Sequence, residues 1–303
     1  LVLLSDHGQS TGATFRQRYG LTLGDLVQRL LAEGRPAGDG DQREAAGAAG
    51  SDGAARAPAA PLAVRQSSGD EGWGHLNALL TEIVRTEGVT GRGAQRLLQG
   101  REEEEADGGS YVALGPEARE RNRRTDDDVV VCPSGNLANV YFTHQPGRLS
   151  LEYMVATYPG LVEGLLAHEG IGFILVYSEA RGHAVMGPRG VHRLDTGEVI
   201  GEDPLASFGP HVAAQLRRIS GYPNVGDLLI NSFCDPITGE VAAFEELIGC
   251  HGGAGGQQQQ PFLLFPAAWT DEIPDLVGAE SVHAFLSRYL HPEAVATEAV
   301  AAG

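Results

Sequence analysis

The chain has 303 residues and carries a formal net charge of −18 at pH 7. This length allows one large domain or two small ones, with enough chain to bury a sizeable core. The negative charge argues against nucleic acid as a partner, because binding a phosphate backbone needs a basic surface, and we attribute the acidity to solubility. Three scattered cysteines form no CxxC pair and so predict no disulfide framework.

No apolar run approaches the roughly 20 residues of a membrane-spanning helix. Membrane association would therefore depend on segments outside this chain. The sequence indicates neither a cellular location nor an oligomeric state.

The chain opens on an apolar run that ends abruptly in Ser5-Asp6-His7-Gly8. We expect residues 1–5 to form a buried parallel strand. A turn at the carboxyl end of such a strand is where open α/β sheets bind ligands. A carboxylate beside an imidazole offers the oxygen and nitrogen donors that suit zinc, and Gly8 lets the backbone turn. On its own the pair also fits a turn capped by Asp6.

Amphipathic spacing predicts a helix over residues 22–32, with Thr22 as its N-cap. Residues 34–72 are rich in Gly, Ala, Asp and Pro, and we expect a disordered insertion there. A second disordered insertion is expected over about 99–128, where a triple Asp (126–128) is more typical of a solvated acidic loop than of a metal site.

From residue 129 onward, strand-like and helix-like segments alternate. We expect residues 227–233 and 240–244 to pair across a Pro- and Gly-containing turn. Alternation of this kind predicts an α/β fold with a mainly parallel sheet covered by helices on both faces. The other segments predicted as strands are 129–132, 137–142, 171–178, 184–186, 191–194 and 262–265, and those predicted as helices are 149–167 (interrupted near 159), 212–219 and 282–290.

A second histidine turn, Gly249-Cys250-His251-Gly252-Gly253, follows another apolar-rich segment. Two His-Gly turns at opposite ends of one chain, each after a strand-like run, indicate two halves of a single site. We therefore expect Asp6, His7 and His251 to share a metal-binding pocket.

These two motifs resemble the alkaline phosphatase superfamily, in particular its type I phosphodiesterase/nucleotide pyrophosphatase branch and the bacterial, often membrane-associated members of that branch. The resemblance covers roughly three quarters of the chain and leaves out the two low-complexity stretches. Further segments that fit the branch, in the expected order, are 12–20, 134–138, 201–205, 208–211 and 261–264.

The resemblance implies a fold incomplete at its N-terminus, with residues 1–303 as the C-terminal part of one domain. It also implies two divalent metal ions, zinc or alternatively manganese, on either side of a Thr or Ser nucleophile. Asp6 and His7 would ligate one metal and His251 the other. In the family order, the nucleophile and the remaining ligands precede the Asp-His-Gly turn, so we expect this chain to be inactive when isolated.

The activity implied for the longer protein is hydrolysis of a small phosphodiester or pyrophosphate. Asp203 and His211 are candidate substrate-binding residues, although loop capping and a helix start explain them as well. An alternative is a non-catalytic remnant that acts as a scaffold or membrane-associated interaction domain. A phosphate mutase of the same superfamily ranks third, because it predicts a basic insertion and the insertions here are acidic.

Overall fold

The computed structural model describes residues 1–34, 62–67, 102–104, 110–112, 127–246, 249–270, 272 and 274–290. The chain divides into two compact units. The first combines residues 1–7 with residues 261–303, and the second comprises residues 8–260. Each unit is described by itself.

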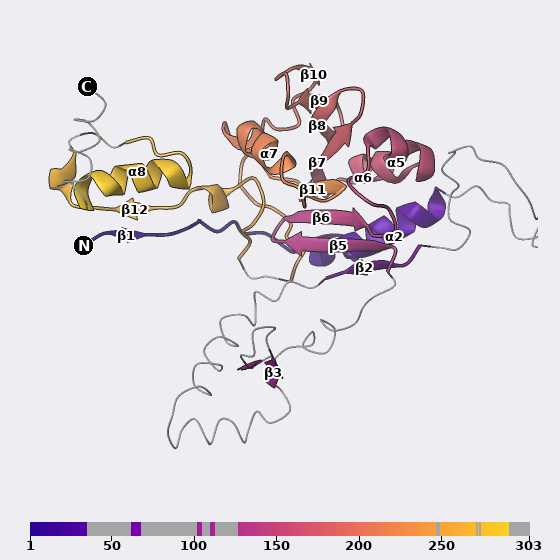
Figure 1. Ribbon diagram of the computed structural model, residues 1–303, viewed down its shortest axis with the longest axis horizontal. Helices are drawn as coiled ribbons and strands as arrows, with labels where there is room; N and C mark the ends of the chain where they lie inside the picture. The colour runs from indigo at the N-terminus through magenta and orange to yellow at the C-terminus, as the bar shows by residue number, and fades with distance from the viewer. Residues whose placement is uncertain are drawn as a thin grey trace, which may run out of the picture. The chain divides into compact units, whose positions relative to one another are not determined.

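The second unit is built on an eight-stranded sheet (Figure 1). Its strands lie in the order β10-β9-β8-β7-β11-β6-β5-β2. The strand bounds along the chain are Val64–Gln66 (β2), Val129–Ser134 (β5), Leu137–Phe142 (β6), Ile171–Ser178 (β7), Gly182–Gly187 (β8), Gly190–Arg193 (β9), Val199–Gly201 (β10) and Leu228–Ser232 (β11). A separate antiparallel pair joins Glu102–Glu104 (β3) to Ser110–Val112 (β4).

The predicted α/β class is confirmed, but the predicted mainly parallel sheet is wrong. Among the described strands of the large sheet, neighbours run antiparallel except β2 and β5. The physical reason is that β5–β6 and β7–β8–β9–β10 follow one another through short turns, and a short turn can join only antiparallel neighbours. Alternating helices and strands do not by themselves specify parallel pairing.

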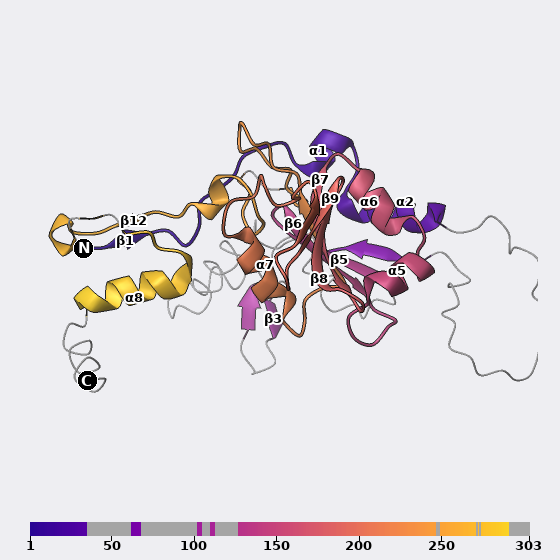
Figure 2. The same ribbon diagram turned by 90° about the horizontal axis from the view of Figure 1, so that it is seen from above.

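Helices cover both faces of this sheet. Ile174 and Val176 of β7 belong to the core cluster that includes α2, α5 and α6, whereas Phe173 and Leu175 belong to the cluster that includes α7. Because successive strand residues point to opposite faces, α7 lies on the face opposite the other three (Figure 2). The helix bounds are Phe15–Tyr19 (α1), Leu23–Glu33 (α2), Leu151–Thr157 (α5), Leu161–Ala167 (α6) and Val212–Ser220 (α7).

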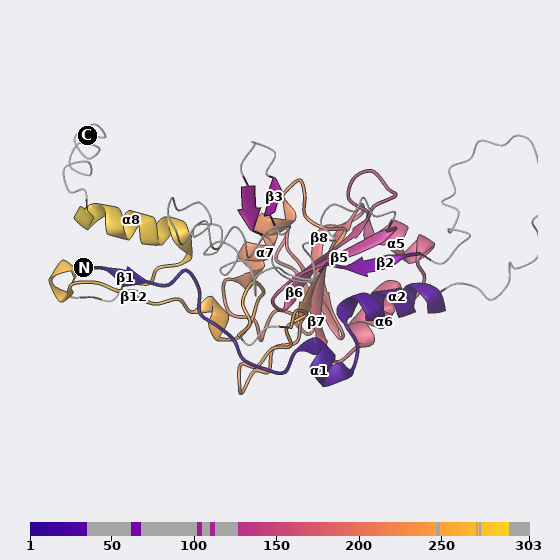
Figure 3. The same cartoon turned by 90° about the horizontal axis from the view of Figure 1, so that it is seen from below.

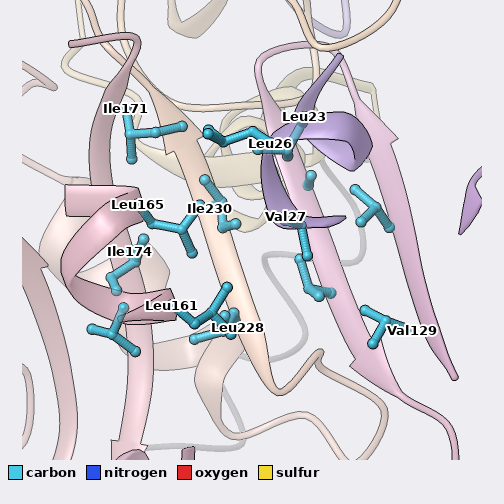
Figure 4. Packing of buried hydrophobic residues seen from close by; sticks show 14 of the residues in the cluster. Leu23, Leu26, Val27, Val129, Leu161, Leu165, Ile171, Ile174, Leu228 and Ile230 are labelled. Atoms are coloured by element: carbon cyan, nitrogen blue, oxygen red, sulfur yellow. The ribbon is translucent and has the colours of Figure 1, made fainter. Parts of the chain in front are cut away.

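Aliphatic side chains of α2 and α6 face the sheet in a buried core (Figure 4). Leu23, Leu26 and Val27 of α2 and Leu161 and Leu165 of α6 are almost fully buried. Side chains from β7 and β11 complete this layer, as Figure 4 shows. Burying each such side chain stabilises the fold by about 1.5–3 kcal/mol.

Local signals placed several of these elements correctly. Thr22 caps α2 in a reciprocal capping box with Asp25, as its position before the amphipathic run predicted. The break expected near Pro159 separates α5 from α6, and Gly160 there has a positive φ of 85°. The strands predicted over 129–132, 137–142 and 171–178 are confirmed as β5, β6 and β7.

The hairpin predicted between 227–233 and 240–244 is wrong. β11 pairs with β6 on one side and with β7 on the other, and only an isolated bridge links Cys234 to Val241. All five residues of β11 are buried. The apolar run was therefore correctly identified as a strand, but its partners lie far away along the chain.

The first unit contains a short two-stranded sheet, Leu3–Leu4 (β1) and Leu263–Leu264 (β12), in which the strands lie side by side (Figure 3). The buried parallel strand predicted at residues 1–5 is wrong, because β1 is antiparallel to β12 and exposes 47% of Leu3 and 53% of Leu4. The core strand predicted at 262–265 is likewise only two residues long. The predicted closing helix is present as Gly278–Leu290 (α8).

Aromatic packing joins α8 to the segment after β12. The Trp269 and Tyr289 rings stack 4.5 Å apart, and Phe285 contacts both rings as well as that of Phe265. A short 3₁₀ turn, Ala267–Trp269, presents Trp269 to the helix. These contacts give the first unit a small apolar core of its own.

The two predicted insertions lie mostly outside the described residues. The first, 34–72, includes β2, whose parallel pairing with β5 extends the large sheet. The second, 99–128, includes the paired strands β3 and β4. Of the predicted triple Asp, Asp127 and Asp128 are described: Asp127 accepts a hydrogen bond from Arg65, and Asp128 accepts one from the Ala63 amide.

Asp227 joins three parts of the second unit through a buried carboxylate. Its two oxygens accept 2.7 Å hydrogen bonds from the backbone N–H groups of Phe142 and Leu149. We expect Asp227→Asn to lower the free energy of unfolding by about 2 kcal/mol, because an amide nitrogen cannot accept from either N–H group. Urea unfolding followed by circular dichroism measures this change. The matched change at an exposed carboxylate, Glu163→Gln, should stay within about 0.5 kcal/mol, and equal losses in both variants would contradict this assignment.

His168 packs against α1, and we expect it to make stability depend on pH. Its ring stacks on Phe15 at 5.2 Å, its Nδ1 accepts a hydrogen bond from the Gly170 amide, and burial lowers its pKa below the ordinary value. Protonation therefore favours the unfolded chain, so stability should fall as the pH drops below about 6.5. Comparing urea midpoints of the wild type and His168→Gln between pH 7.5 and 5 tests this, and an equally steep decline in the variant would rule it out.

Candidate functional site

The loop that carries His251 is attached to the opening segment of the second unit. Ser10 and Cys250 exchange two backbone hydrogen bonds of 2.8 Å, which form an isolated antiparallel bridge. His251 is the next residue, and the glycine-rich segment 252–256 follows it. The backbone on the amino side of His251 is therefore held by the sequence-distant Ser10.

The carbonyl of His251 lies directly against the turn between β5 and β6. A Cβ atom built on Gly135 would lie 1.7 Å from the His251 carbonyl oxygen, and Gly135 has a φ of 60°. One residue further on, Gly252 has a φ of 105°, and a Cβ there would lie 2.5 Å from Ser134 Oγ. Glycine is needed at both positions, because only glycine combines this backbone conformation with so close an approach. The structure thus brings together the segments around 134–138 and 249–253.

Buried amide side chains fix the loop from beneath. Asn136 and Asn231 are both 0% exposed, and each donates its Nδ2–H to the Ala254 carbonyl, at 2.9 and 3.1 Å. The Ala254 amide in turn donates to Asn231 Oδ1 at 2.8 Å, and Gln258 Nε2 donates to Asn136 Oδ1 at 2.9 Å. Buried polar groups are costly unless they are paired, so this network specifies one loop conformation.

Two further side chains extend the network. The Ser10 hydroxyl donates a hydrogen bond to the Gly255 carbonyl at 3.2 Å and accepts one from the backbone N–H group of Gln258 at 3.1 Å. The Glu245 carboxylate, only 7% exposed, accepts a hydrogen bond from the Gly135 amide. The β5–β6 turn and the loop after His251 are therefore both fixed by hydrogen bonds to their main-chain groups.

The other two predicted metal ligands lie in the first unit. Asp6 is exposed and accepts a 3.0 Å hydrogen bond from the His7 amide. Asp6 and His7 thus belong to a different unit from His251. Within the residues that the structure describes, no group of three or more His, Cys, Asp and Glu side chains is arranged to hold a metal ion. The shared metal pocket stays a prediction.

Asp203 accepts a backbone hydrogen bond in the loop after β10 and also contacts the imidazole of His192. Its Oδ1 accepts from the Leu205 amide at 2.9 Å and lies 3.0 Å from His192 Nδ1. Both residues line a pocket of about 430 Å³ against the start of α7. The loop-capping role considered for Asp203 is present, together with an imidazole contact that the sequence did not indicate.

His211 occupies the N-cap position of α7, the helix start considered for it from the sequence. Its side chain forms no capping hydrogen bond, and it lines a second pocket of about 540 Å³. The opposite wall of this pocket is formed by residues that follow His251, including Gly256 and Gln257. Asp203 and His211 therefore line different pockets on the two sides of the Gly209–Pro210 segment.

Sequence reasoning missed the residues that hold the loop. Asn136 lies between two predicted strands, Gln258 belongs to a run of four glutamines, and Asn231 lies inside a predicted apolar strand. An asparagine within an apolar strand was the one available signal, because a polar residue there needs a partner.

Comparisons with known protein families, curated proteins and solved structures give no match. Among the helices of the described residues, none is long and apolar enough to cross a membrane.

The approach of Gly135 to His251 can be tested with a matched pair of glycine substitutions. Gly135→Ala forces the His251 carbonyl away. Gly147→Ala creates a similar backbone strain, at φ 79°, but its added Cβ atom would meet no neighbouring atom within 4 Å. We expect Gly147→Ala to cost about 1 kcal/mol of unfolding free energy and Gly135→Ala at least about 2 kcal/mol more. Urea unfolding measures both losses, and equal losses would contradict the contact.

Proposed function

We propose that this chain contributes to a metal-dependent hydrolase of phosphoric esters, with a phosphodiester or pyrophosphate as substrate. The resemblance of Ser5-Asp6-His7-Gly8 and Gly249-Cys250-His251-Gly252-Gly253 to the alkaline phosphatase superfamily motivates this assignment. In this proposal Asp6 and His7 bind one divalent cation and His251 binds the other.

The observation that best supports the proposal is the way the His251 loop is held. A metal ligand works only when its main chain is fixed, because coordination distances tolerate little movement. Asn136, Asn231 and Gln258 supply that support from positions that are 0–4% exposed. A glycine-rich loop that merely connects two elements does not need a buried, fully paired amide network.

The chemistry of the three side chains suits zinc, and manganese is the alternative. Imidazole nitrogen and carboxylate oxygen are both zinc ligands. Bound metal ions would clamp the phosphoryl oxygens and offset their negative charge. This attraction matters for a chain with a net charge of −18, because its own field repels an anionic ester.

The three ligands are too few for two metal ions. Structural zinc takes about four ligands, and catalytic zinc takes about three plus one open position. Two ligands for one ion and one for the other predict weak binding and no turnover by these 303 residues alone. The nucleophile is not assigned to any residue of the chain.

A second candidate function, an interaction domain, is favoured by the apolar surface of the first unit. Leu1 is 97% exposed, and Leu3, Leu4, Phe262 and Leu264 each expose about half or more of their surface. Leu3 and its paired residue Leu264 lie on the same face of the β1–β12 sheet, and adjacent exposed apolar side chains are typical of a protein contact. Metal binding distinguishes the two candidates, because an interaction domain does not need it.

Zinc titration of three single variants tests the hydrolase proposal. Zn²⁺ affinity is measured by isothermal titration calorimetry for the wild type, His7→Gln, His251→Gln and the control His283→Gln, whose exposed histidine lies on α8. We expect weak binding that falls about tenfold or more in the first two variants and is unchanged in the control. Equal affinity in all four proteins would contradict the proposal.

Hydrolysis of bis(p-nitrophenyl) phosphate with added Zn²⁺ or Mn²⁺ complements the titration. We expect no turnover from the isolated chain. Metal-dependent turnover that disappears in His251→Ala would refute the argument that the chain has too few metal ligands for catalysis. The same result would support the proposal that the chain is part of a hydrolase.

A further inference from the structure

A polar pocket lies beside the loop that carries His251. Its volume is about 540 Å³, and three segments of the second unit form its walls: residues 207–212 with Gln215, residues 234–239, and residues 256, 257, 259 and 260. All of these residues belong to one compact unit, so the pocket is a feature of that unit alone.

The glutamine run divides between the interior and this pocket. Gln257–Gln259 form a 3₁₀ turn in which Gln258 is 4% exposed and belongs to the buried amide network. Gln257, Gln259 and Gln260 are exposed and line the pocket. The run of four glutamines therefore supplies one buried structural amide and three exposed residues that line the pocket.

One of the pocket amides, that of Gln259, is positioned by the fold. Gln259 Oε1 accepts a 3.1 Å hydrogen bond from the Gly255 amide, which orients the side chain and leaves its NH₂ group as a donor. Gln215, an exposed residue of α7, also lines the pocket. Thr238 adds a hydroxyl group to the rim.

The charge of the lining argues against an anion as the matching ligand. No lysine or arginine lines the described pocket, and its single acid is Asp235. The Asp235 carboxylate accepts hydrogen bonds from the amides of Thr238 and Ile237, and these bonds lower its pKa and commit it to the turn. The remaining polar side chains of the lining are uncharged amides and hydroxyl groups together with the imidazole of His211, and they stand beside apolar residues such as Phe208 and Ile237.

We propose that this pocket binds a neutral polyhydroxylated group, a sugar or a polyol. Primary amides pair with vicinal hydroxyl groups because both partners donate and accept hydrogen bonds. A neutral ligand also avoids repulsion from a chain of net charge −18. This inference rests on the proposed function in one respect: the bound group is then the alcohol part of the phosphoric ester, placed beside the His251 loop.

The test is a titration of the metal-free, ¹⁵N-labelled protein with myo-inositol and with sorbitol, in the presence of EDTA. The side-chain NH₂ signals of Gln257 and Gln259 are assigned from single variants. We expect both signals to shift saturably with at least one polyol. The double variant Gln257→Leu/Gln259→Leu should bind at least about tenfold more weakly, the loss that corresponds to two neutral hydrogen bonds.

The matched control is Gln145→Leu, which removes a glutamine outside the pocket lining and should leave the affinity unchanged. Unfolding midpoints of all variants establish that the fold is intact. Inorganic phosphate and adenosine serve as comparison ligands. The inference is overturned by the absence of a saturable shift with either polyol, by a response to phosphate alone, or by an equal loss in the control.

These outcomes are separate from the metal test, because no metal is present. Polyol binding combined with an unchanged zinc affinity in His251→Gln would support the proposed polyol site and contradict the proposed hydrolase function. The reverse combination would keep the hydrolase and reject the pocket.

Discussion

The contact between the β5–β6 turn and the His251 carbonyl governs the arrangement of the candidate site. Gly135 leaves no room for a side chain, so the glycine-rich loop can lie only where the turn allows it. Asn136, the residue after Gly135, forms hydrogen bonds with Ala254 and Gln258. Ser134, the residue before Gly135, lies against Gly252. A backbone contact between two distant parts of the chain thus determines where the imidazole-bearing residue, the amide network and the adjoining pocket can lie.

Local features of the sequence predicted individual elements well and predicted their pairing poorly. Thr22 before an amphipathic run, the break near Pro159 and the apolar run over 171–178 are short-range signals, and α2, α5, α6 and β7 followed from them. The sheet direction was wrong, because strand pairing depends on which distant segments meet, and residue periodicity does not encode that. The strand β1 was misjudged for the same reason: its antiparallel partner β12 lies far along the chain, and the leucines of β1 are exposed.

The candidate site was predictable in its titratable residues but not in its support. His251, Asp203 and His211 drew attention because their side chains carry chemistry, and each lies in a loop or at a helix start. Asn136 and Gln258 are ordinary residues in ordinary sequence contexts. Their importance comes from being almost fully buried, which is a property of the assembled fold.

The place of β11 in the sheet determines the order in which the second unit can assemble. β5 and β6 form one hairpin and β7 to β10 form a meander, and within the described sheet the two groups are joined through β11, which lies between β6 and β7 and follows both in the chain. A ribosome must therefore release residue 232 before the halves can join. Until then each half exposes an unpaired edge rich in apolar side chains, a natural target for chaperones.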